Sequence, residues 1–254
     1  ENTRVGYNIE IDEKNVENAG ALENNDIIKN TNLLNNISIV NKDLVLQNLN
    51  GTLTNKGYYT YNSSKIGKYS INNEDMLLYI SPREIVNKEN SYINSTYEYT
   101  HGYGAIATSV SSTNNAGNLE NYQKSFIEND LKITQPRIYF GLQTNETIVT
   151  NSTTKQEFDY PISDGKNETN KYDGKAGLKL GFADRLVLAI SQGDVKLALS
   201  SDVHSNSKIL TNRNIIKRAK EIMPYLLYDE NPYLVITDEG KLVWVLDAYT
   251  TSNY

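Results

Sequence analysis

Apolar residues recur at helical spacing in the segment 212–223, which has the clearest periodicity in the chain. Residues three and four positions apart share one face of a helix. The apolar positions that fall on such a face are Ile215, Ile216, Ala219 and Ile222. The basic residues lie toward the other face, at Arg213, Lys217 and Lys220. The pattern predicts an amphipathic helix, and Pro224 ends it because proline disfavours helical geometry in the preceding residue.

Two shorter helices are predicted just upstream. The first runs from Ala183 to Gln192, and Gly193 supplies the residue type that most often follows a helix end. Asp194 then offers a side-chain oxygen to the free backbone N–H groups of a second helix, which runs through Leu199.

The first part of the chain gives weaker signals. Residues 1–55 predict a polar, partly helical segment, and residues 56–254 predict the body of the domain. Asn41 can cap a short helix whose apolar residues include Val45 and Leu49. The Asn50-Gly51 pair is also a hairpin signal, so a β-hairpin stays an alternative at this place.

Strand-like patterns are more numerous than helical ones. They occupy segments 68–71 and 76–80 around the turn pair Asn72-Asn73, segments 137–142 and 147–150, and a C-terminal hairpin of 233–236 and 242–246 with its turn at 238–240. Strands and helices do not alternate regularly. We therefore expect an α+β fold, with a mixed or mostly antiparallel sheet, several short helices and a C-terminal β-hairpin.

Composition excludes several classes of function. A net charge of −6 and a pI of about 5.1 argue against nucleic acid as a partner, because such a groove needs a basic face. The absence of cysteine from the sequence excludes disulfides, thiolate metal sites and cysteine nucleophiles. The apolar stretches are far shorter than the ~20 residues of a membrane helix, so we expect this polypeptide by itself to be soluble. Tyrosine outnumbers phenylalanine 19 to 4, which suits strands, clefts and interfaces.

One histidine lies in an unusual local sequence. His101 stands in the run Tyr99-Thr100-His101-Gly102-Tyr103-Gly104. A histidine in an aromatic, glycine-rich turn could bind a ligand or shuttle a proton. It could equally hold the turn as a hydrogen-bonded structural residue. We favour the structural role, because two nearby glycines indicate an unusual backbone that needs to be fixed.

Two other patterns fail as catalytic motifs. The run from Gly102 to Ala107 has the glycine spacing of a dinucleotide fingerprint, but a Ser/Thr-rich stretch follows it instead of a helix. Ser200, Asp202 and His204 have the residue types of a hydrolase triad. Close neighbours in sequence seldom form one, and the chain has no Gly-x-Ser-x-Gly motif. We expect a solvated turn there.

An acidic loop is the one place that suggests a metal. Its carboxylates include Asp159, Asp164 and Asp173, and oxygen-rich loops can hold calcium. The spacing of an EF-hand is absent. A solvated loop is the better prediction, so we expect no cofactor and keep calcium as a weak alternative.

Short blocks along the chain carry a resemblance to a known family. The blocks are Tyr97 to Gly104, Ile80-Ser81-Pro82-Arg83-Glu84-Ile85, Arg137-Ile138-Tyr139-Phe140-Gly141, Glu157-Phe158-Asp159-Tyr160-Pro161, Tyr172 to Gly177, Leu199 to Asp202, Ile222 to Leu226, and Asp247-Ala248-Tyr249-Thr250-Thr251-Ser252. In order and spacing the chain resembles uncharacterised protein family 0182, large bacterial membrane proteins that cross the membrane several times. Where the family tends to be rich in Asp, this chain reads Asn62 to Tyr69 without acids.

The resemblance implies a location more than an activity. It places this chain in the first part of an extracytoplasmic region that follows several membrane helices, at the outer face of the cell membrane. The family pattern continues beyond the Tyr-Thr-Thr-Ser block, so the implied partners are the protein's own membrane helices and a C-terminal segment. The family supplies no catalytic residues. The blocks nevertheless mark Asp247 and Tyr249, with the Tyr99–Gly104 run, as candidate binding or structural residues.

Three functions stay open. The first is a binding or assembly domain without catalysis, which a buried His101 would support. The second is an enzyme acting on envelope glycans or lipids, which needs His101 to meet a carboxylate such as Asp247 or Asp173 in an open cleft. The third is a calcium- or glycan-binding module, which an exposed pair of tyrosines beside a groove would indicate. We lean away from an enzyme, and the identity of any small-molecule or glycan ligand is open.

Overall fold

The computed structural model describes residues 37–53, 58–71, 73–86, 91–113, 119–122, 131–162, 165–179 and 181–251. Its helices are few and short, and its strands form several small antiparallel sheets. This confirms the α+β class. The proposed boundary near residue 55 stays a prediction, because residues 1–36 and 54–57 lie outside the described part of the chain.

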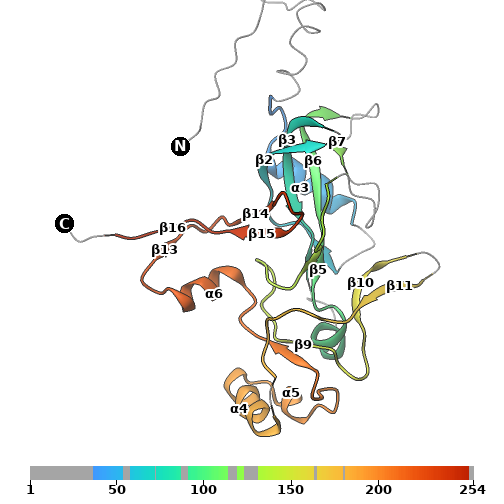
Figure 1. Ribbon diagram of the computed structural model, residues 1–254, viewed down its shortest axis with the longest axis vertical. Coiled ribbons are helices and arrows are strands. Elements are labelled where there is room, and N and C mark those ends of the chain that lie inside the picture. Colours follow the sequence, from blue (N-terminus) through green and yellow to red (C-terminus); the bar gives the residue numbers. More distant parts are fainter. Residues whose placement is uncertain are drawn as a thin grey trace, which may run out of the picture.

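The largest sheet lies at one end of the molecule (Figure 1). Its four antiparallel strands run in the order β2 (Lys65–Ile71), β3 (Glu74–Pro82), β6 (Ala105–Thr113) and β7 (Leu119–Asn121). Successive side chains of a strand point to opposite faces. In β3, Leu78 and Ile80 enter one apolar cluster while Tyr79 enters the cluster on the other face. The predicted strands 68–71 and 76–80 are confirmed and longer than expected.

Helix α3 (Lys42–Gly51) covers one face of this sheet. Asn41 caps it, since its Oδ1 accepts from Leu44 N at 2.8 Å. The hairpin alternative at Asn50-Gly51 is wrong. Asn50 instead holds the helix to the next segment, because its side chain donates to Tyr61 O and accepts from Tyr61 N.

The predicted C-terminal hairpin is confirmed. Strands β14 (Tyr233–Ile236) and β15 (Leu242–Val245) pair with Ile236 opposite Leu242. Gly240 takes a φ of +76°, which few other residues adopt in a tight turn. Leu234 is buried in the same apolar cluster as Leu78 and Ile80 of β3.

A second group of elements forms the opposite end of the molecule (Figure 1). It contains α4 (Phe182–Gln192), α5 (Val195–Leu199) and the strand pair β9 (Ile148–Thr150) and β12 (Lys208–Leu210). Both helices are confirmed. Gly193 ends α4 with a φ of +69°, and Asp194 caps α5 by accepting from Leu197 N.

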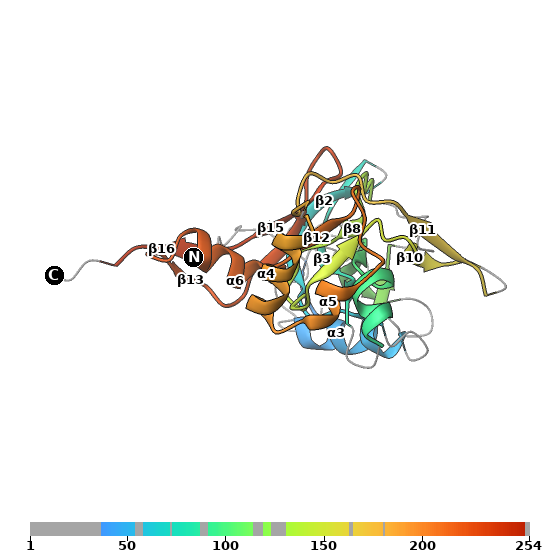
Figure 2. The same cartoon turned by 90° about the horizontal axis from the view of Figure 1, so that it is seen from below.

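An arm projects from the side of the molecule in both views (Figures 1 and 2). We call it the apolar arm; it consists of residues 215–228, which contain α6 (Ile215–Ile222) and β13 (Leu227–Tyr228), and of residues 247–249, which contain β16 (Ala248–Tyr249), the partner of β13. Tyr228 fixes the helix to the strands, since its hydroxyl donates to the carbonyls of Ala219 and Met223. The predicted helix over 212–223 is confirmed, with Asn214 as its cap.

Three further short strand pairs belong to the fold. They are β1 (Tyr59–Thr60) with β4 (Glu84–Ile85), β5 (Gly102–Tyr103) with β8 (Arg137–Ile138), and β10 (Glu157–Pro161) with β11 (Asn167–Asn170). The predicted strand 137–142 ends at Ile138. The chain turns there because Gly141 N donates to Thr144 Oγ1 and to Arg213 O instead of to a neighbouring strand. Among the described residues, no helix has the length and apolar character needed to cross a membrane.

Candidate functional site

The Thr100–Gly104 run is held against the segment that carries Arg83. Tyr103 N donates to Arg83 O, and Arg83 N donates to Gly104 O. A Cβ atom at Gly102 would lie 2.2 Å from Arg83 O, so only glycine permits this approach. Gly104 takes a φ of +69°. Gly102 therefore allows the backbone to approach Arg83 closely, and Gly104 allows the chain to turn.

His101 is completely buried in the middle of this run. Its Nε2 lies 3.1 Å from Asp159 Oδ1, and its ring meets the Tyr139 ring edge-on at 4.6 Å. The contact with Asp159 lacks hydrogen-bond geometry, and neither ring nitrogen has a hydrogen-bond partner among the described residues. Burial and the charges of Arg213 and Arg137 hold the pKa of His101 well below 6.5. The ring is therefore neutral and closed to solvent.

Asp159 faces an arginine as well as the histidine. Arg137 Nε donates to Asp159 Oδ1 at 2.9 Å, and Arg137 Nη2 donates to Asp159 Oδ2 at 2.7 Å. This planar pairing is the strong form of an ion pair. Tyr59 also donates its hydroxyl to the backbone carbonyl of Asp159. The carboxylate lies in strand β10 and is buried, so the solvated-loop interpretation is wrong for this residue.

Glu157 lies two residues earlier on the same strand and accepts hydrogen bonds from several groups. Its Oε2 accepts from Thr100 Oγ1 at 2.9 Å and from the Tyr139 hydroxyl at 2.7 Å. Its Oε1 accepts from Asn151 N at 3.2 Å. Burial raises the pKa of Glu157, and these hydrogen bonds partly offset the rise. The carboxyl group links three segments that are distant in sequence.

Arg213 contacts Thr100 and Tyr139, the same residues that bind Glu157, and its role differs from the sequence prediction. The residue was expected on the wet face of a helix, but α6 starts at Ile215 and Arg213 precedes it. Its fully buried guanidinium donates to the carbonyls of Thr100, Tyr139 and Glu146. Burial lowers the pKa of Arg213 to about 10. Lys217 and Lys220 are exposed, as predicted.

The Arg83-Glu84 pair, which belongs to another of the sequence blocks, is also buried. Arg83 Nε donates to the Tyr61 hydroxyl, and its Nη1 donates to Tyr103 O. Glu84 Oε2 accepts from Leu142 N at 2.6 Å and from Gln143 N at 3.0 Å. Burial raises the pKa of Glu84 against these two hydrogen bonds. Sequence reasoning missed both roles, although a charged pair directly after a strongly apolar strand is a usable signal.

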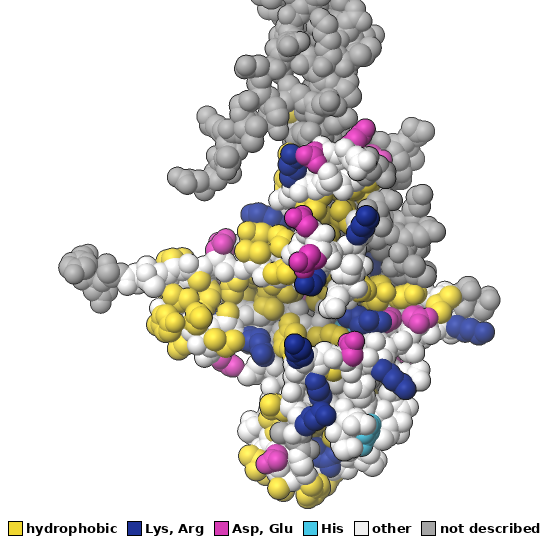
Figure 3. Space-filling model, in the orientation of Figure 1, with side chains coloured by type: hydrophobic (Ala, Val, Ile, Leu, Met, Phe, Trp, Pro, Cys, Tyr) yellow, Lys and Arg dark blue, Asp and Glu magenta, His cyan; other side chains and the backbone are white. Residues whose placement is uncertain are grey.

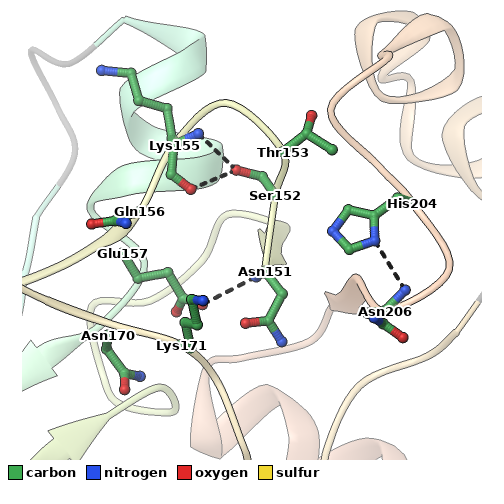
Figure 4. A pocket seen from close by; sticks show the side chains of 10 residues that line it. All are labelled: Asn151, Ser152, Thr153, Lys155, Gln156, Glu157, Asn170, Lys171, His204 and Asn206. Carbon is green, nitrogen blue, oxygen red and sulfur yellow. Dashed lines mark hydrogen bonds between the residues drawn. The ribbon is translucent and has the colours of Figure 1, made fainter.

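Glu157 also lines a polar pocket of about 510 Å³ (Figure 4). The wall consists of the loop 151–157, the pair Asn170-Lys171 and the residues His204 and Asn206. Lys155 pairs with Glu98 at 2.9 Å, and His204 Nδ1 accepts from Asn206 N. Amide, hydroxyl and amino groups predominate, so this pocket can hydrogen-bond a polar molecule.

The Ser200–His204 turn does not form a triad. Ser200 Oγ accepts from the Tyr97 hydroxyl at 2.7 Å, while Asp202 accepts from Thr154. His204 interacts with its own loop through Asn206 and Ser207. These contacts agree with the predicted turn.

The remaining candidate residues lie elsewhere. Asp247 and Tyr249 are exposed on the apolar arm, and Tyr249 pairs in register with Leu227. Asp173 is exposed in the loop after β11, where it lines a pocket together with Arg137, and Asp164 lies outside the described residues. The described part of the chain shows no group of three acidic or histidine residues that could hold a metal. His101 thus meets neither Asp247 nor Asp173 in an open cleft.

The whole chain, residues 1–254, matches the family model described as Uncharacterised protein family (UPF0182). The chain belongs to UPF0182. A UPF0182 protein of Clostridium botulinum strain Okra is 43% identical over 202 residues, covering 77% of this chain and 22% of that protein. A UPF0182 protein of Clostridium novyi is 42% identical, and the match covers 82% of this chain and 24% of that protein. A UPF0182 protein of Caldicellulosiruptor saccharolyticus is 40% identical, and the match covers 99% of this chain and 29% of that protein.

The chain thus spans about a quarter of the length of these UPF0182 relatives. Its bacterial family is established, and the family has no assigned activity. No solved structure matches the chain.

Proposed function

We propose that this UPF0182 segment is an extracytoplasmic domain of a membrane protein and that it serves binding and assembly. The observation that carries the proposal is the exposed apolar arm. The chain that bears this arm spans only about a quarter of its relatives' length. The buried charged groups around His101, which are Glu157, Asp159 and Arg213, support a scaffold role, because Glu157 and Arg213 bind backbone groups of distant segments.

The apolar arm exposes large side chains that a monomer normally buries. On α6 and the turn after it, Ile222 is 65% exposed and Tyr225 is 72% exposed. On the strand pair, Leu227 is 48% exposed and Tyr249 is 57% exposed. Hydrophobic side chains gather over this arm in the space-filling view (Figure 3). Contiguous apolar surface of this kind marks an interaction site.

The occupant we propose is the remaining part of the same polypeptide. The relatives are long enough to supply it, since more than two thirds of each lies outside the matched region. An intramolecular partner benefits from a high effective concentration, so a surface of moderate size is sufficient.

Cysteine labelling of the protein at its relatives' length tests both halves of this proposal in cells. The 254-residue chain has no cysteine, so once any cysteine in the rest of the protein is replaced by serine, a single introduced thiol reports one position. Ser205→Cys lies in an exposed loop, and we expect a membrane-impermeant maleimide to label it in intact cells. Ser207→Cys, which is buried, is the matched control and should react only after unfolding. Labelling of Ser205→Cys only after lysis would show that the domain faces the cytoplasm.

The arm is tested with Tyr225→Cys. We expect this thiol to react quickly in the 254-residue chain and slowly in the protein at its relatives' length, because the rest of the protein covers it. Ser205→Cys should react equally in both. Equal reactivity of Tyr225→Cys in the two forms would rule out docking on the arm.

A further inference from the structure

Aromatic side chains from three distant segments line a second pocket, of about 470 Å³. We call it the aromatic pocket; its rings are those of Tyr139, Phe140, Tyr172 and Trp244. They come from the turn after β8, the loop after β11 and strand β15. The pocket lies within the size range of small-molecule sites.

Contacts with neighbouring groups fix the rings of Trp244, Tyr172 and Tyr139. Trp244 Nε1 donates to Phe140 O at 2.9 Å, and the Tyr172 hydroxyl donates to Ala176 O at 3.1 Å. The rings of Tyr139 and Tyr172 meet edge-on with centroids 4.7 Å apart. Tyr139 is held in turn by the Glu157 network. A ligand would therefore meet a wall whose shape exists before binding, which lowers the entropic cost of association.

Two charged side chains complete the pocket. One edge of the Arg137 guanidinium is occupied by Asp159, while 37% of the side chain is exposed to solvent. Asp173 lines the same pocket and is exposed. Arg137 offers hydrogen-bond donors and Asp173 offers an acceptor. Because the charge of Arg137 is already paired with Asp159, its remaining N–H groups serve hydrogen bonding and do not act as a free positive charge. This pair fits a ligand whose groups both donate and accept hydrogen bonds, as hydroxyl groups do.

We propose that the aromatic pocket binds a neutral saccharide. The C–H face of a sugar ring carries partial positive charge and packs on the negative face of an aromatic ring. Its hydroxyl groups would then meet Arg137 and Asp173. Trp244 is the stacking platform in this assignment, because it is half-buried and held rigidly by its hydrogen bond to Phe140. This inference is independent of the apolar arm, since none of the residues that line the pocket belongs to α6, β13 or β16.

The single tryptophan makes a direct test possible. Because Trp244 is the one tryptophan of the chain, its fluorescence reports this pocket alone. We would titrate the 254-residue chain with soluble trisaccharides of N-acetylglucosamine and of glucose, and with N-acetylglucosamine itself. A saturable change in emission with at least one trisaccharide is expected, and tighter binding of a trisaccharide than of the monosaccharide indicates a glycan chain rather than a free sugar.

Calorimetry with variants then locates the site. Trp244→Ala should weaken trisaccharide binding by roughly tenfold through loss of the stacking surface. Asp173→Asn, which keeps the size of the side chain, should weaken it less. Tyr225→Ala removes an exposed aromatic residue from the arm and should leave binding unchanged. Circular dichroism establishes that each variant is folded.

Two results would overturn the assignment. One is an unchanged Trp244 emission with all three sugars in a folded sample. The other is equal affinity for a trisaccharide in Trp244→Ala and Tyr225→Ala, which would place binding elsewhere. A proline-rich peptide that binds Trp244 while the sugars do not would assign the pocket to a protein partner instead.

Discussion

His101 Nε2 lies 3.1 Å from Asp159 Oδ1, while both oxygens of that carboxylate accept hydrogen bonds from Arg137. The arginine thus supplies the positive charge that the carboxylate needs. The buried histidine has no reason to become protonated, and its pKa is lowered by burial first and by Arg213 and Arg137 second. The ring acts as a neutral spacer between strand β10 and the Tyr139 ring.

Acidification should therefore destabilise the fold through His101. The unfolded chain binds a proton at this residue below a pH of about 6.5, whereas the folded chain does not. The free energy of unfolding should fall by up to about 1.4 kcal/mol per pH unit below that value. Above pH 6.5 this loss of stability is absent, because the histidine is neutral in both the folded and the unfolded chain. Urea unfolding at a series of pH values measures it.

Variants of the two histidines separate this effect from the titration of other groups. The raised pKa values of Glu84 and Glu157 act in the opposite direction, because the folded state keeps their protons longer as pH rises. The comparison between variants is therefore decisive. His101→Phe should lose the pH dependence due to the ring, and His204→Ala should retain it. Identical pH profiles for His101→Phe and the parent chain would contradict a neutral buried His101.

Gly141→Ala should destabilise the protein by about 1–3 kcal/mol, because it displaces a buried carboxylate from its donors. The added Cβ would lie 2.1 Å from Glu84 Oε2, the oxygen that accepts from Leu142 N and Gln143 N. Gly51→Ala is the control, since nothing lies within 4 Å of its Cβ at the end of α3. Thermal unfolding compares them, and an equally mild effect of both would show that Glu84 relaxes freely.

Arg137→Ala should cost about 2–4 kcal/mol, because it leaves the carboxylate of Asp159 buried without its partner. This expected loss of stability is smaller than for a fully enclosed ion pair, because the Arg137 side chain is partly exposed. Lys68→Ala breaks the exposed Lys68–Asp75 pair and should cost far less stability, because solvent screens the attraction between exposed charges. Chemical denaturation of both variants in low and high salt checks the difference. Similar losses would mean that Asp159 gains water or another partner.

Arg213→Met should be among the most damaging substitutions in the chain. It keeps an unbranched apolar stem but removes the donors to three backbone carbonyls. Those of Thr100 and Tyr139 are buried, and each costs about 1–3 kcal/mol when left unsatisfied. Lys217→Met, at an exposed position close by on α6, should change the stability by less than about 0.5 kcal/mol. The yield of folded protein and its urea midpoint measure both. A well-folded Arg213→Met protein would show that the three carbonyls find other donors.

The local sequence determined the elements that carry their own signals. Gly193 and Asp194 mark the boundary between α4 and α5, and the Asp238–Gly240 turn marks the C-terminal hairpin, because capping and turn geometry depend on a few adjacent residues. The resemblance of the motif blocks identified UPF0182, which the family match then established. At Asn50-Gly51, where helix end and hairpin share a local signal, tertiary contact with Tyr61 decided for the helix.

Only the tertiary structure decided which charged side chains are buried and what they hold. Arg213 binds the carbonyl of Thr100, 113 residues away in sequence, and Glu84 binds backbone N–H groups 58 and 59 residues away. Such a burial is stable only when distant donors and acceptors converge, so neither periodicity nor composition predicts it. The same convergence assembles the aromatic pocket from Tyr139, Tyr172 and Trp244. The sequence thus determined the elements and the family, and the packing of remote segments determined the sites.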